Sequence, residues 1–547
     1  MKLTFLLLLC TTMVSALTKP MVATSFGPIV GFQHKANDRT YNVFLGIRYA
    51  KAPDHIFRFQ KPEPVEKWDF LQHDATHFRA SCIPSLRSEL EEHVNYSEDC
   101  LFLNIITPED YKGKKLPVVV YIHGGGFQFG DSVDIGYEKA AENFVANDII
   151  FVSVQYRLGP LGFFTTGDSE VPGNFGLWDQ TMALNFLHEV LADFGGDAQR
   201  ITLAGHSAGA GSVSAHLYSP HSDHLFNQAI QLSGSIFSES YIHSDVVEDS
   251  KALAKAVGCL HETSKRIREC MEIQTIDQIL DAMEEIGEVL PGPRNIKFHP
   301  HVDTDFFPYN LEKMSRKAPK KRTLQGLVNL EFGQSVLSQN HLTKLLGIAE
   351  DKWASFGKED VAKFIKEQVA SESDFGSTSG IFQQIVQDFY LPDWQNANSS
   401  VYLYAYAQHG WETFFYVIDY QSETTRDPRL PLRGAFHASE LRFLFEKDVK
   451  ESVAYDERDK LFATNFVSAL VNFIKTGNPS TPAVPWPAAT PVAPFKNLLL
   501  NDHPVVQENY RDNAYVLWKQ SVAGVVGSEL LKRRLPAADA ARIHTEL

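Results

Sequence analysis

The sequence predicts an α/β protein in which helices cover a central, mostly parallel sheet. Three short runs rich in β-branched residues, 118–122, 149–154 and 201–204, are typical of buried central strands. Between the last two, residues 179–194 place apolar side chains at helical spacing, and Gly195 follows to end the helix. The alternation of strand, helix and strand is the pattern of a parallel sheet with crossover helices.

The composition is that of a globular protein that can bury a large core. Of the 547 residues, 44% are hydrophobic, and the mean hydropathy is -0.20, which excludes disordered and fibrous classes. The 67 acidic residues outnumber the 51 Lys and Arg residues, for a net charge of -16. Because binding to a phosphate backbone depends on clustered Lys and Arg, nucleic acid is excluded as a partner. No internal repeat or low-complexity linker divides the chain into modules.

The N-terminal residues are typical of a cleaved secretory signal peptide, which we assign to residues 1–16. Lys2 precedes a short apolar run, and Val14, Ser15 and Ala16 place small residues where a signal peptidase cuts. A membrane anchor is the alternative, but it needs about 20 apolar residues, and polar residues interrupt this run earlier. Since no later segment is long and apolar enough, we expect no membrane span.

The last four residues, His-Thr-Glu-Leu at 544–547, have the form of the signals that the endoplasmic reticulum retrieval receptor reads. They end a Pro- and Ala-rich stretch, and we expect residues 536–547 to form a flexible tail. Together with the signal peptide, this tail predicts residence in the lumen of the endoplasmic reticulum, with the retrieval receptor as a partner. A secreted protein with an accidental match is the alternative.

The cysteines predict disulfides. Cys10 lies in the signal peptide, so four cysteines remain in the mature chain: Cys82, Cys100, Cys259 and Cys270. An even number in an oxidising compartment indicates two disulfides, with three possible connectivities, and four buried thiols are the alternative. Glycosylation sequons begin at Asn95 and Asn398. Asn95 is favoured because it lies inside the small cysteine loop.

A candidate nucleophile follows the third predicted strand. Gly205-His206-Ser207-Ala208-Gly209 matches the pattern G-x-S-x-G between a strand and a helix made of small residues. The turn from strand to helix is so tight that side chains on either side of the serine would clash, which explains the glycines. The turn holds the hydroxyl of Ser207 in the open, where it can attack a substrate.

A glycine-rich loop after the first predicted strand supplies candidate oxyanion donors. His123 is followed by three glycines, which let backbone N–H groups approach a substrate oxygen, as in the oxyanion loops of lipases and esterases. Gly125, Gly126 and the amide of Ala208 would then offer three donors. The alternatives are an ordinary flexible loop or a phosphate cradle, but no Lys or Ser/Thr of the P-loop kind follows.

In these motifs the chain resembles the type-B carboxylesterases of the cholinesterase and carboxylesterase family. The likeness extends from residues 44–50 to the C-terminus, and residues 97–105, 194–197 and 205–209 match the family's signatures. The resemblance implies the α/β-hydrolase fold, with helices on both faces of the sheet and a single large domain at residues 17–535. It also favours sequential disulfide pairing, in which each cysteine bonds to the next along the chain.

The resemblance implies a catalytic triad in the chain order Ser, Glu, His. His437 lies in Gly434-Ala435-Phe436-His437-Ala438-Ser439-Glu440, which is similar to the family's histidine loop and makes it the general base. Glu331 ends residues 326–331, which are similar to the strand and loop that carry the family's glutamate. Phe332 departs from the small residue that the family usually has there. An exposed loop carboxylate is the alternative for Glu331.

These residues together predict a serine carboxylesterase that splits a small or lipid-like ester into acid and alcohol through an acyl-enzyme on Ser207. Cholinesterases of the family hold choline on a tryptophan between the first two cysteines, and this chain has none there. The alternatives are a lipase or an acyltransferase that uses the same triad, or a catalytically dead neuroligin-like binding protein. No cofactor is implied, and the scattered histidines predict no metal site.

Overall fold

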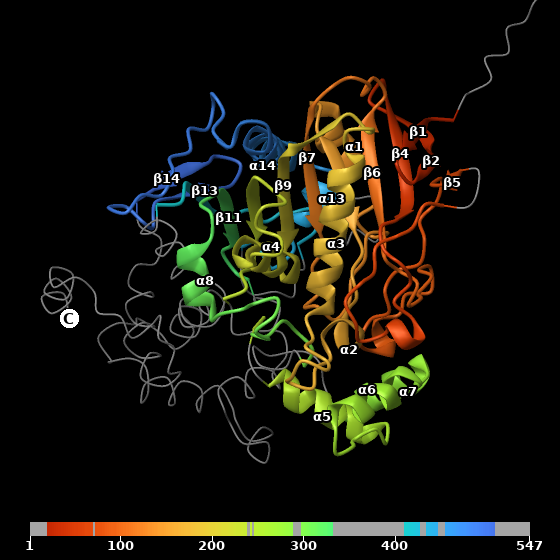
Figure 1. Cartoon of the computed structure of the whole chain (residues 1–547). Helices are drawn as coiled ribbons and strands as arrows, with labels where there is room; N and C mark the ends of the chain where they lie inside the picture. Colours follow the sequence, from red (N-terminus) through yellow and green to blue (C-terminus); the bar gives the residue numbers. More distant parts are fainter. Residues whose placement is uncertain are drawn as a thin grey trace, which may run out of the picture.

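The computed structural model describes residues 19–68, 72–237, 241–242, 245–287, 297–331, 410–426, 434–446 and 454–508 (Figure 1). The predicted signal peptide, the sequon at Asn398 and the tail at residues 536–547 lie outside the described residues. Within the described ranges, no helix has the length and apolar composition that a membrane crossing requires.

A large sheet forms the centre of the molecule (Figure 1). Eleven strands of the described chain pair in the order β14-β13-β12-β11-β10-β9-β7-β8-β6-β4-β3. In chain order they are β3 (Phe32–Ala36), β4 (Arg39–Arg48), β6 (Phe102–Pro108), β7 (Leu116–Ile122), β8 (Ile150–Val154), β9 (Gly196–His206), β10 (Gln228–Leu232), β11 (Arg322–Val328), β12 (Thr413–Ile418), β13 (Asn497–Leu500) and β14 (Val505–Gln507). The strands from β8 through β13 are parallel, and those at both edges are antiparallel. The predicted mostly parallel sheet is therefore confirmed.

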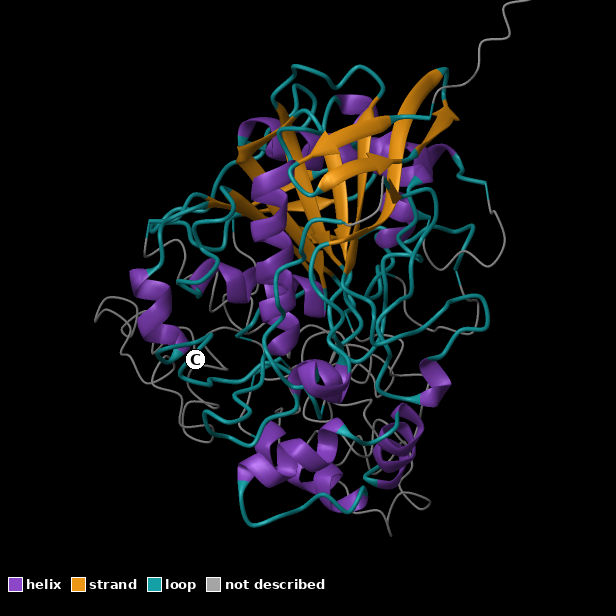
Figure 2. Ribbon diagram, turned by 45° about the vertical axis from the view of Figure 1, so that its right-hand side comes forward, coloured by secondary structure: helices purple, strands orange, loops and turns teal. Residues whose placement is uncertain are grey.

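Helices cover both faces of this sheet (Figure 2). One face carries α2 (Gly159–Phe163), α3 (Phe175–Val190) and α4 (Ala208–Tyr218), and the other carries α1 (Glu138–Asn143), α13 (Leu441–Phe445) and α14 (Glu457–Thr476). Two buried cores result. Val118 and Val120 of β7 pack into the first core, whereas Val119 and Tyr121 pack into the second, because successive side chains of a strand point to opposite faces.

The remaining elements lie around this centre. A small sheet is made of β1 (Met21–Thr24), β2 (Gly27–Val30) and β5 (His73–Asp74). The helices α5 (Val246–Ala256), α6 (Ser264–Glu272) and α7 (Ile276–Glu285) gather at the bottom of Figure 1, and α8 (Leu311–Lys317) precedes β11. Three short 3-10 turns are η1 (His55–Phe57), η2 (Arg87–Glu89) and η3 (Val145–Asn147).

Local sequence explains where the helices begin and end. The side chain of Asp456 accepts a hydrogen bond from the backbone of Asp459 and starts α14, and Gly477, at φ 77°, ends it in the left-handed region. The predicted helix at residues 179–194 is α3, which begins four residues earlier than expected and ends at Val190, four residues before its expected end. A contact far away in the sequence holds the start of this helix. The buried side chain of Asn174, the residue before α3, donates a hydrogen bond to the carbonyl of His301 and accepts one from its N–H.

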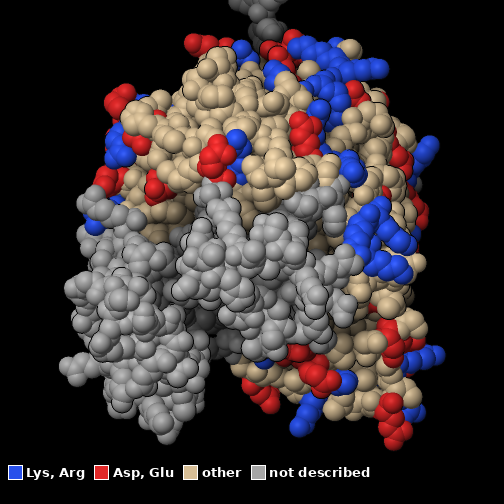
Figure 3. Space-filling view, turned by 90° about the vertical axis from the view of Figure 1, so that its left-hand side faces the viewer, with Lys and Arg blue, Asp and Glu red and all other residues tan. Residues whose placement is uncertain are grey.

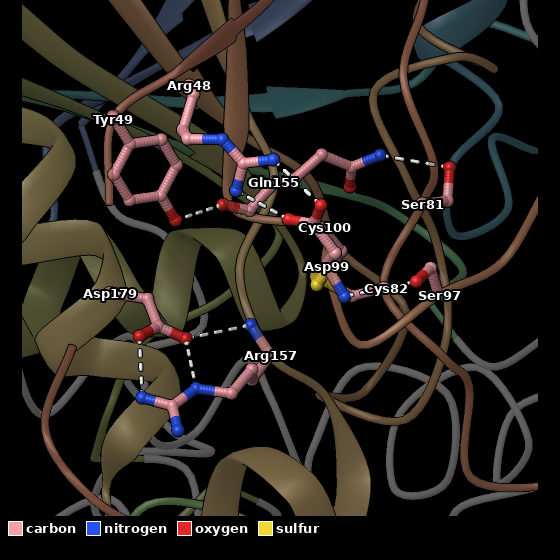
Figure 4. Close-up of a disulfide and its surroundings, with 10 residues drawn as sticks. All are labelled: Arg48, Tyr49, Ser81, Cys82, Ser97, Asp99, Cys100, Gln155, Arg157 and Asp179. Carbon is pink, nitrogen blue, oxygen red and sulfur yellow. Dashed lines mark hydrogen bonds and ion pairs between the residues drawn. A yellow bond between two sulfur atoms is a disulfide. The ribbon is translucent and has the colours of Figure 1, made fainter. Parts of the chain in front are cut away.

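Both disulfides follow the sequential pairing that the family resemblance favoured. Cys82 bonds to Cys100, and Cys259 bonds to Cys270. Figure 4 shows the first disulfide beside an ion pair in which the guanidinium of Arg48 binds the carboxylate of Asp99 at 2.5 and 2.7 Å. The exposed Asn95 lies in the loop that this disulfide closes, as a glycosylation acceptor requires.

A buried ion pair fastens α3 to the chain that follows β8 (Figure 4). The guanidinium of Arg157 donates to both oxygens of Asp179 at 2.7 and 2.8 Å, and the backbone N–H of Arg157 donates to the same carboxylate at 3.0 Å. The two side chains are 3% and 0% exposed. Because each charge is neutralised by the other, both can be buried near the N-terminal end of α3.

Charged side chains of both signs lie on the outside of the molecule. On the face shown in Figure 3, Lys and Arg side chains gather along the right-hand side, and acidic side chains lie next to them. The net charge of -16 therefore does not make this face uniformly acidic.

Candidate active site

Ser207 lies on the turn between β9, the middle strand of the large sheet, and α4; both elements are labelled in Figure 1. Its backbone has φ 55° and ψ -122°, a combination that a non-glycine residue adopts only under strain. A Cβ atom on Gly205 would collide with the carbonyl of Gly209, and one on Gly209 would collide with the carbonyl of Ile122. The two glycines of the motif are therefore required by the tight turn, as the sequence predicts.

The loop after β11 and the loop before α13 are joined by backbone hydrogen bonds. The N–H of Leu330 donates to the carbonyl of Ala435 at 3.0 Å, and the N–H of His437 donates to the carbonyl of Glu331 at 3.2 Å. The carboxylate of Glu331 also accepts a bond from the N–H of Val328 at 3.0 Å. This pairing holds the candidate base and the candidate acid next to each other, although 106 residues separate them.

The three residues predicted as a triad form one continuous hydrogen-bonded array. Nε2 of His437 lies 2.9 Å from Oγ of Ser207, and Nδ1 of His437 lies 2.5 Å from Oε2 of Glu331. Glu331 is 1% exposed, so it is not the exposed loop carboxylate of the alternative interpretation. Phe332, the departure from the family pattern, lies outside the described residues.

The glycine-rich loop lies directly against the serine. A Cβ atom on Gly124 would stand 2.7 Å from the carbonyl oxygen of His206 and 3.0 Å from Cβ of Ser207, so only glycine allows this approach. Gly125 and Gly126 have φ of 103° and 62°, which glycine adopts without strain. In the described chain, the N–H groups of Gly125, Gly126 and Ala208 donate to no protein acceptor. These three N–H groups, in the glycine-rich loop and in the turn after Ser207, are the candidate oxyanion donors.

A second buried carboxylate, Glu440 of the histidine loop, lies near His437, and the sequence assigned it no role. Glu440 is 1% exposed, and its Oε1 lies 3.5 Å from Nε2 of His206 and accepts a bond from Oγ of Ser233 at 3.3 Å. Ser233 and His206 are far from Glu440 in the sequence, so no local pattern predicts these contacts. The only signal in the sequence is Glu440 itself, at the end of the histidine motif. Burial and the nearby charge of Glu331 raise the pKa of Glu440 to about 7.

The two carboxylates determine the charge of the candidate base. Burial lowers the pKa of His437, but the negative charges of Glu331 and Glu440 outweigh burial, and the net result is a raised pKa. The imidazole is the form that can accept a proton from Ser207. The site therefore favours the imidazolium that forms after proton transfer, and it loses the free base at a higher pH than an ordinary histidine would.

Replacing Glu440 with glutamine is expected to move the acid limb of the kcat/KM profile to lower pH by less than about half a pH unit, because Glu440, with a pKa of about 7, is itself partly protonated there. The Glu440 carboxylate favours the protonated, inactive form of His437, so its removal lowers the pKa of the base. The measurement is kcat/KM for a p-nitrophenyl ester between pH 5 and 9. The control is Glu63→Gln, which neutralises an exposed partner of Lys51. An acid limb that stays in place, or moves to higher pH, would contradict the assignment.

One group of potential metal ligands occurs in the described part of the chain. Glu91, His93 and Asp134 place ligand atoms within 4.8 Å of one another, a proximity that the spacing of the histidines did not predict. Nε2 of His93 lies 3.3 Å from Glu91 and 3.9 Å from Asp134. Glu91 and His93 are exposed. This geometry is that of a surface ion-pair cluster.

A serine on a strained strand-to-helix turn, with a mostly parallel sheet behind it, defines an α/β-hydrolase. The chain belongs to the carboxylesterase family, because the sequence profile of that family matches residues 18–518. It is 32% identical to gut esterase 1 of Caenorhabditis briggsae, over 85% of this chain and 86% of that protein. It is also 32% identical to esterase FE4 of Myzus persicae, over 87% and 88% of the two chains.

A third relative is named for a particular substrate class. The pyrethroid hydrolase Ces2e of Rattus norvegicus is 28% identical over 94% of this chain and 92% of its own length. The family and these relatives, all named as esterases or hydrolases, identify this chain as a carboxylic ester hydrolase. The predicted family and fold class are confirmed.

Proposed function

We propose that the chain is a serine carboxylesterase that works through an acyl-enzyme on Ser207. The observation that carries the proposal is the array in which His437 Nε2 lies 2.9 Å from Ser207 Oγ while its Nδ1 contacts Glu331 at 2.5 Å. A serine hydroxyl becomes an effective nucleophile only when a base removes its proton, and this array supplies such a base.

The roles of the three residues follow from their contacts. His437 takes the proton of Ser207 as Oγ attacks the ester carbonyl, and then gives it to the oxygen of the leaving alcohol. Glu331 fixes the imidazole so that Nε2 faces the serine, and it stabilises the imidazolium. Water then attacks the acyl-enzyme with His437 again as base, which releases the acid and restores Ser207.

Backbone groups stabilise the tetrahedral intermediates of both steps. As the carbonyl carbon becomes tetrahedral, its oxygen gains a negative charge, and the amides of Gly125, Gly126 and Ala208 stand ready to donate to it. Each such donor contributes about 3 to 4 kcal/mol to transition-state stabilisation in serine hydrolases. Because the donors are backbone groups in a tight loop, they need no rearrangement when the charge develops.

Ester substrates without a choline group fit the sequence best. No tryptophan lies among residues 83–99, between the cysteines of the first disulfide. A quaternary ammonium would therefore find no indole there for a cation–π contact. A neutral acyl ester needs only the nucleophile, the base and the oxyanion donors, all of which are present.

The test is hydrolysis of p-nitrophenyl esters from acetate to palmitate by the purified protein. A carboxylesterase is expected to give its highest kcat/KM on the short acyl chains, with release of free acid. A preference for the long chains would replace the proposal with lipase action, and transfer of the acyl group to an added alcohol in place of water would replace it with acyl transfer. No turnover on any ester would favour the non-catalytic alternative.

We also propose that the protein resides in the lumen of the endoplasmic reticulum, held there by the retrieval receptor. The support is the pairing of a signal-like N-terminus with the His-Thr-Glu-Leu end of the chain. Deleting residues 543–547 is expected to release the protein from cells into the medium. Retention equal to that of the full chain would contradict the proposal.

A further inference from the structure

Ser207 Oγ has a second close neighbour besides the imidazole. The hydroxyl of Tyr241 lies 3.0 Å from it, at hydrogen-bond distance. Tyr241 is 2% exposed, and its ring packs edge-on against Phe127 of the glycine-rich loop, with the ring centroids 5.7 Å apart. On its other side the ring lies over α4, where a Cβ atom on Gly211 would stand 3.2 Å from Cδ2. The hydroxyl is therefore aimed at the nucleophile by packing on two sides.

The direction of this hydrogen bond follows from the rest of the array. The carboxylate of Glu331 can only accept, so Nδ1 of neutral His437 carries the hydrogen and Nε2 carries a lone pair. Ser207 must give its own hydrogen to Nε2 if His437 is to act as base. Oγ is then left as an acceptor, and the tyrosine hydroxyl is the donor that faces it.

We propose that Tyr241 is a fourth catalytic residue, which donates a hydrogen bond to Ser207 Oγ whenever negative charge collects on that atom. This inference rests on the proposed function, in which Ser207 is the nucleophile. It assigns to the hydroxyl of Tyr241 a task different from that of the backbone amides. The amides receive the substrate's carbonyl oxygen, whereas the tyrosine acts on the oxygen of the enzyme.

The donor assists both halves of the reaction. In acylation, the O–H bond of Ser207 breaks, the proton moves to His437 Nε2, and Oγ forms a bond to the carbonyl carbon as an electron pair moves to the carbonyl oxygen. Oγ carries excess charge while its proton is leaving and its new bond is incomplete. In deacylation, the bond between Oγ and carbon breaks, and Oγ carries the same excess charge until His437 returns a proton. A single donor at Oγ therefore lowers the barrier to acylation and the barrier to deacylation.

The test compares Tyr241→Phe with the unaltered protein and with a control. The change removes one oxygen atom and keeps the ring that packs on Phe127. Tyr49→Phe is the matched control, because it removes another buried tyrosine hydroxyl, one that donates to the backbone of Gln155 at 2.6 Å. For each protein, active sites are counted with an organophosphate, and pre-steady-state kinetics on p-nitrophenyl acetate separate acylation from deacylation.

For Tyr241→Phe we expect both rate constants, per titrated site, to fall by about 10- to 100-fold, the effect of losing one hydrogen bond to a charged atom. Phosphylation of Ser207 by the organophosphate should slow by a similar factor, because it uses the same attack by Oγ. Tyr49→Phe should keep the unaltered rates per site, and Tyr241→Phe should keep the thermal midpoint of the unaltered protein.

Two results would overturn the inference. Unchanged acylation, deacylation and phosphylation rates in Tyr241→Phe would show that the hydroxyl does not stabilise charge on Ser207 Oγ. A rise in KM alone, with both rate constants retained, would assign Tyr241 to substrate binding. If the Tyr241 variant behaves normally while Ser207→Ala is inactive, only this inference fails. If Ser207→Ala keeps its activity, the proposed function itself fails.

Discussion

Ser207→Ala is expected to lower kcat for ester hydrolysis by about 10⁶-fold. In the proposed mechanism, the substitution removes the atom that forms the acyl bond, which is also the atom 2.9 Å from Nε2 of His437 whose proton that base takes. The oxyanion donors remain, so a residual rate about 10³- to 10⁴-fold above that in water should persist. The measurement is kcat on p-nitrophenyl acetate with protein of verified mass and purity.

The fold should survive this change. The backbone N–H of Ser207 still donates to the carbonyl of Leu232 at 2.8 Å, and alanine meets the same backbone conformation as serine. Ser214→Ala is the matched control, because it removes another buried hydroxyl of α4, one that contacts Ser235 at 3.3 Å and not the triad. Full activity in the Ser207 variant, or an equal loss in the control, would refute the role of Ser207 as nucleophile.

Asp179→Ala is expected to destabilise the fold by about 3 to 5 kcal/mol. The substitution leaves the guanidinium of Arg157 buried without its counter-charge, and it also removes the acceptor of the Arg157 backbone N–H. Water cannot solvate the unpaired guanidinium, because the side chains of Arg157 and Asp179 are only 3% and 0% exposed. The free energy of unfolding from urea denaturation gives the comparison.

The control for this prediction is a second Arg–Asp pair of similar geometry. Arg48 binds Asp99 through two bonds, but the side chains are 26% and 42% exposed, so water can replace the lost partner. Asp99→Ala should therefore cost only about 1 kcal/mol or less. Equal losses in the two variants would mean that burial does not set the strength of these pairs.

Local patterns in the sequence predicted the central sheet and Ser207. The strand before Ser207, the tight glycine turn and the small-residue helix are consecutive, so their physics can be recognised in one stretch of sequence. His437 and Glu331 were found from their similarity to a family, and the structure shows the physical link, which is the backbone pairing of their two loops. Phe332 departs from the family pattern next to Glu331, but the N–H of Val328, at the end of β11, donates a hydrogen bond to the Glu331 carboxylate.

Contacts between side chains that are far apart in the sequence could not be predicted from local patterns. Tyr241 stands 34 residues after Ser207 in an unremarkable segment, and only the fold brings its hydroxyl to the nucleophile. The pairing of His206 with Glu440 likewise depends on how the loop of His437 packs against the end of β9. The antiparallel strands β3, β4 and β6 were not predicted, because parallel pairing was inferred only where a helix connects two strands.

The order of strands in the large sheet has a consequence for how the protein is made. From the β3 edge to the β14 edge, the spatial order follows the order along the chain, except that β7 and β8 exchange places. A nascent chain leaving the ribosome can therefore add almost every strand to a partner that has already been synthesised. Until synthesis ends, however, the newest strand presents unpaired backbone groups to its surroundings. The growing sheet should need protection by chaperones until β14, which has three residues, ends it with a short edge strand.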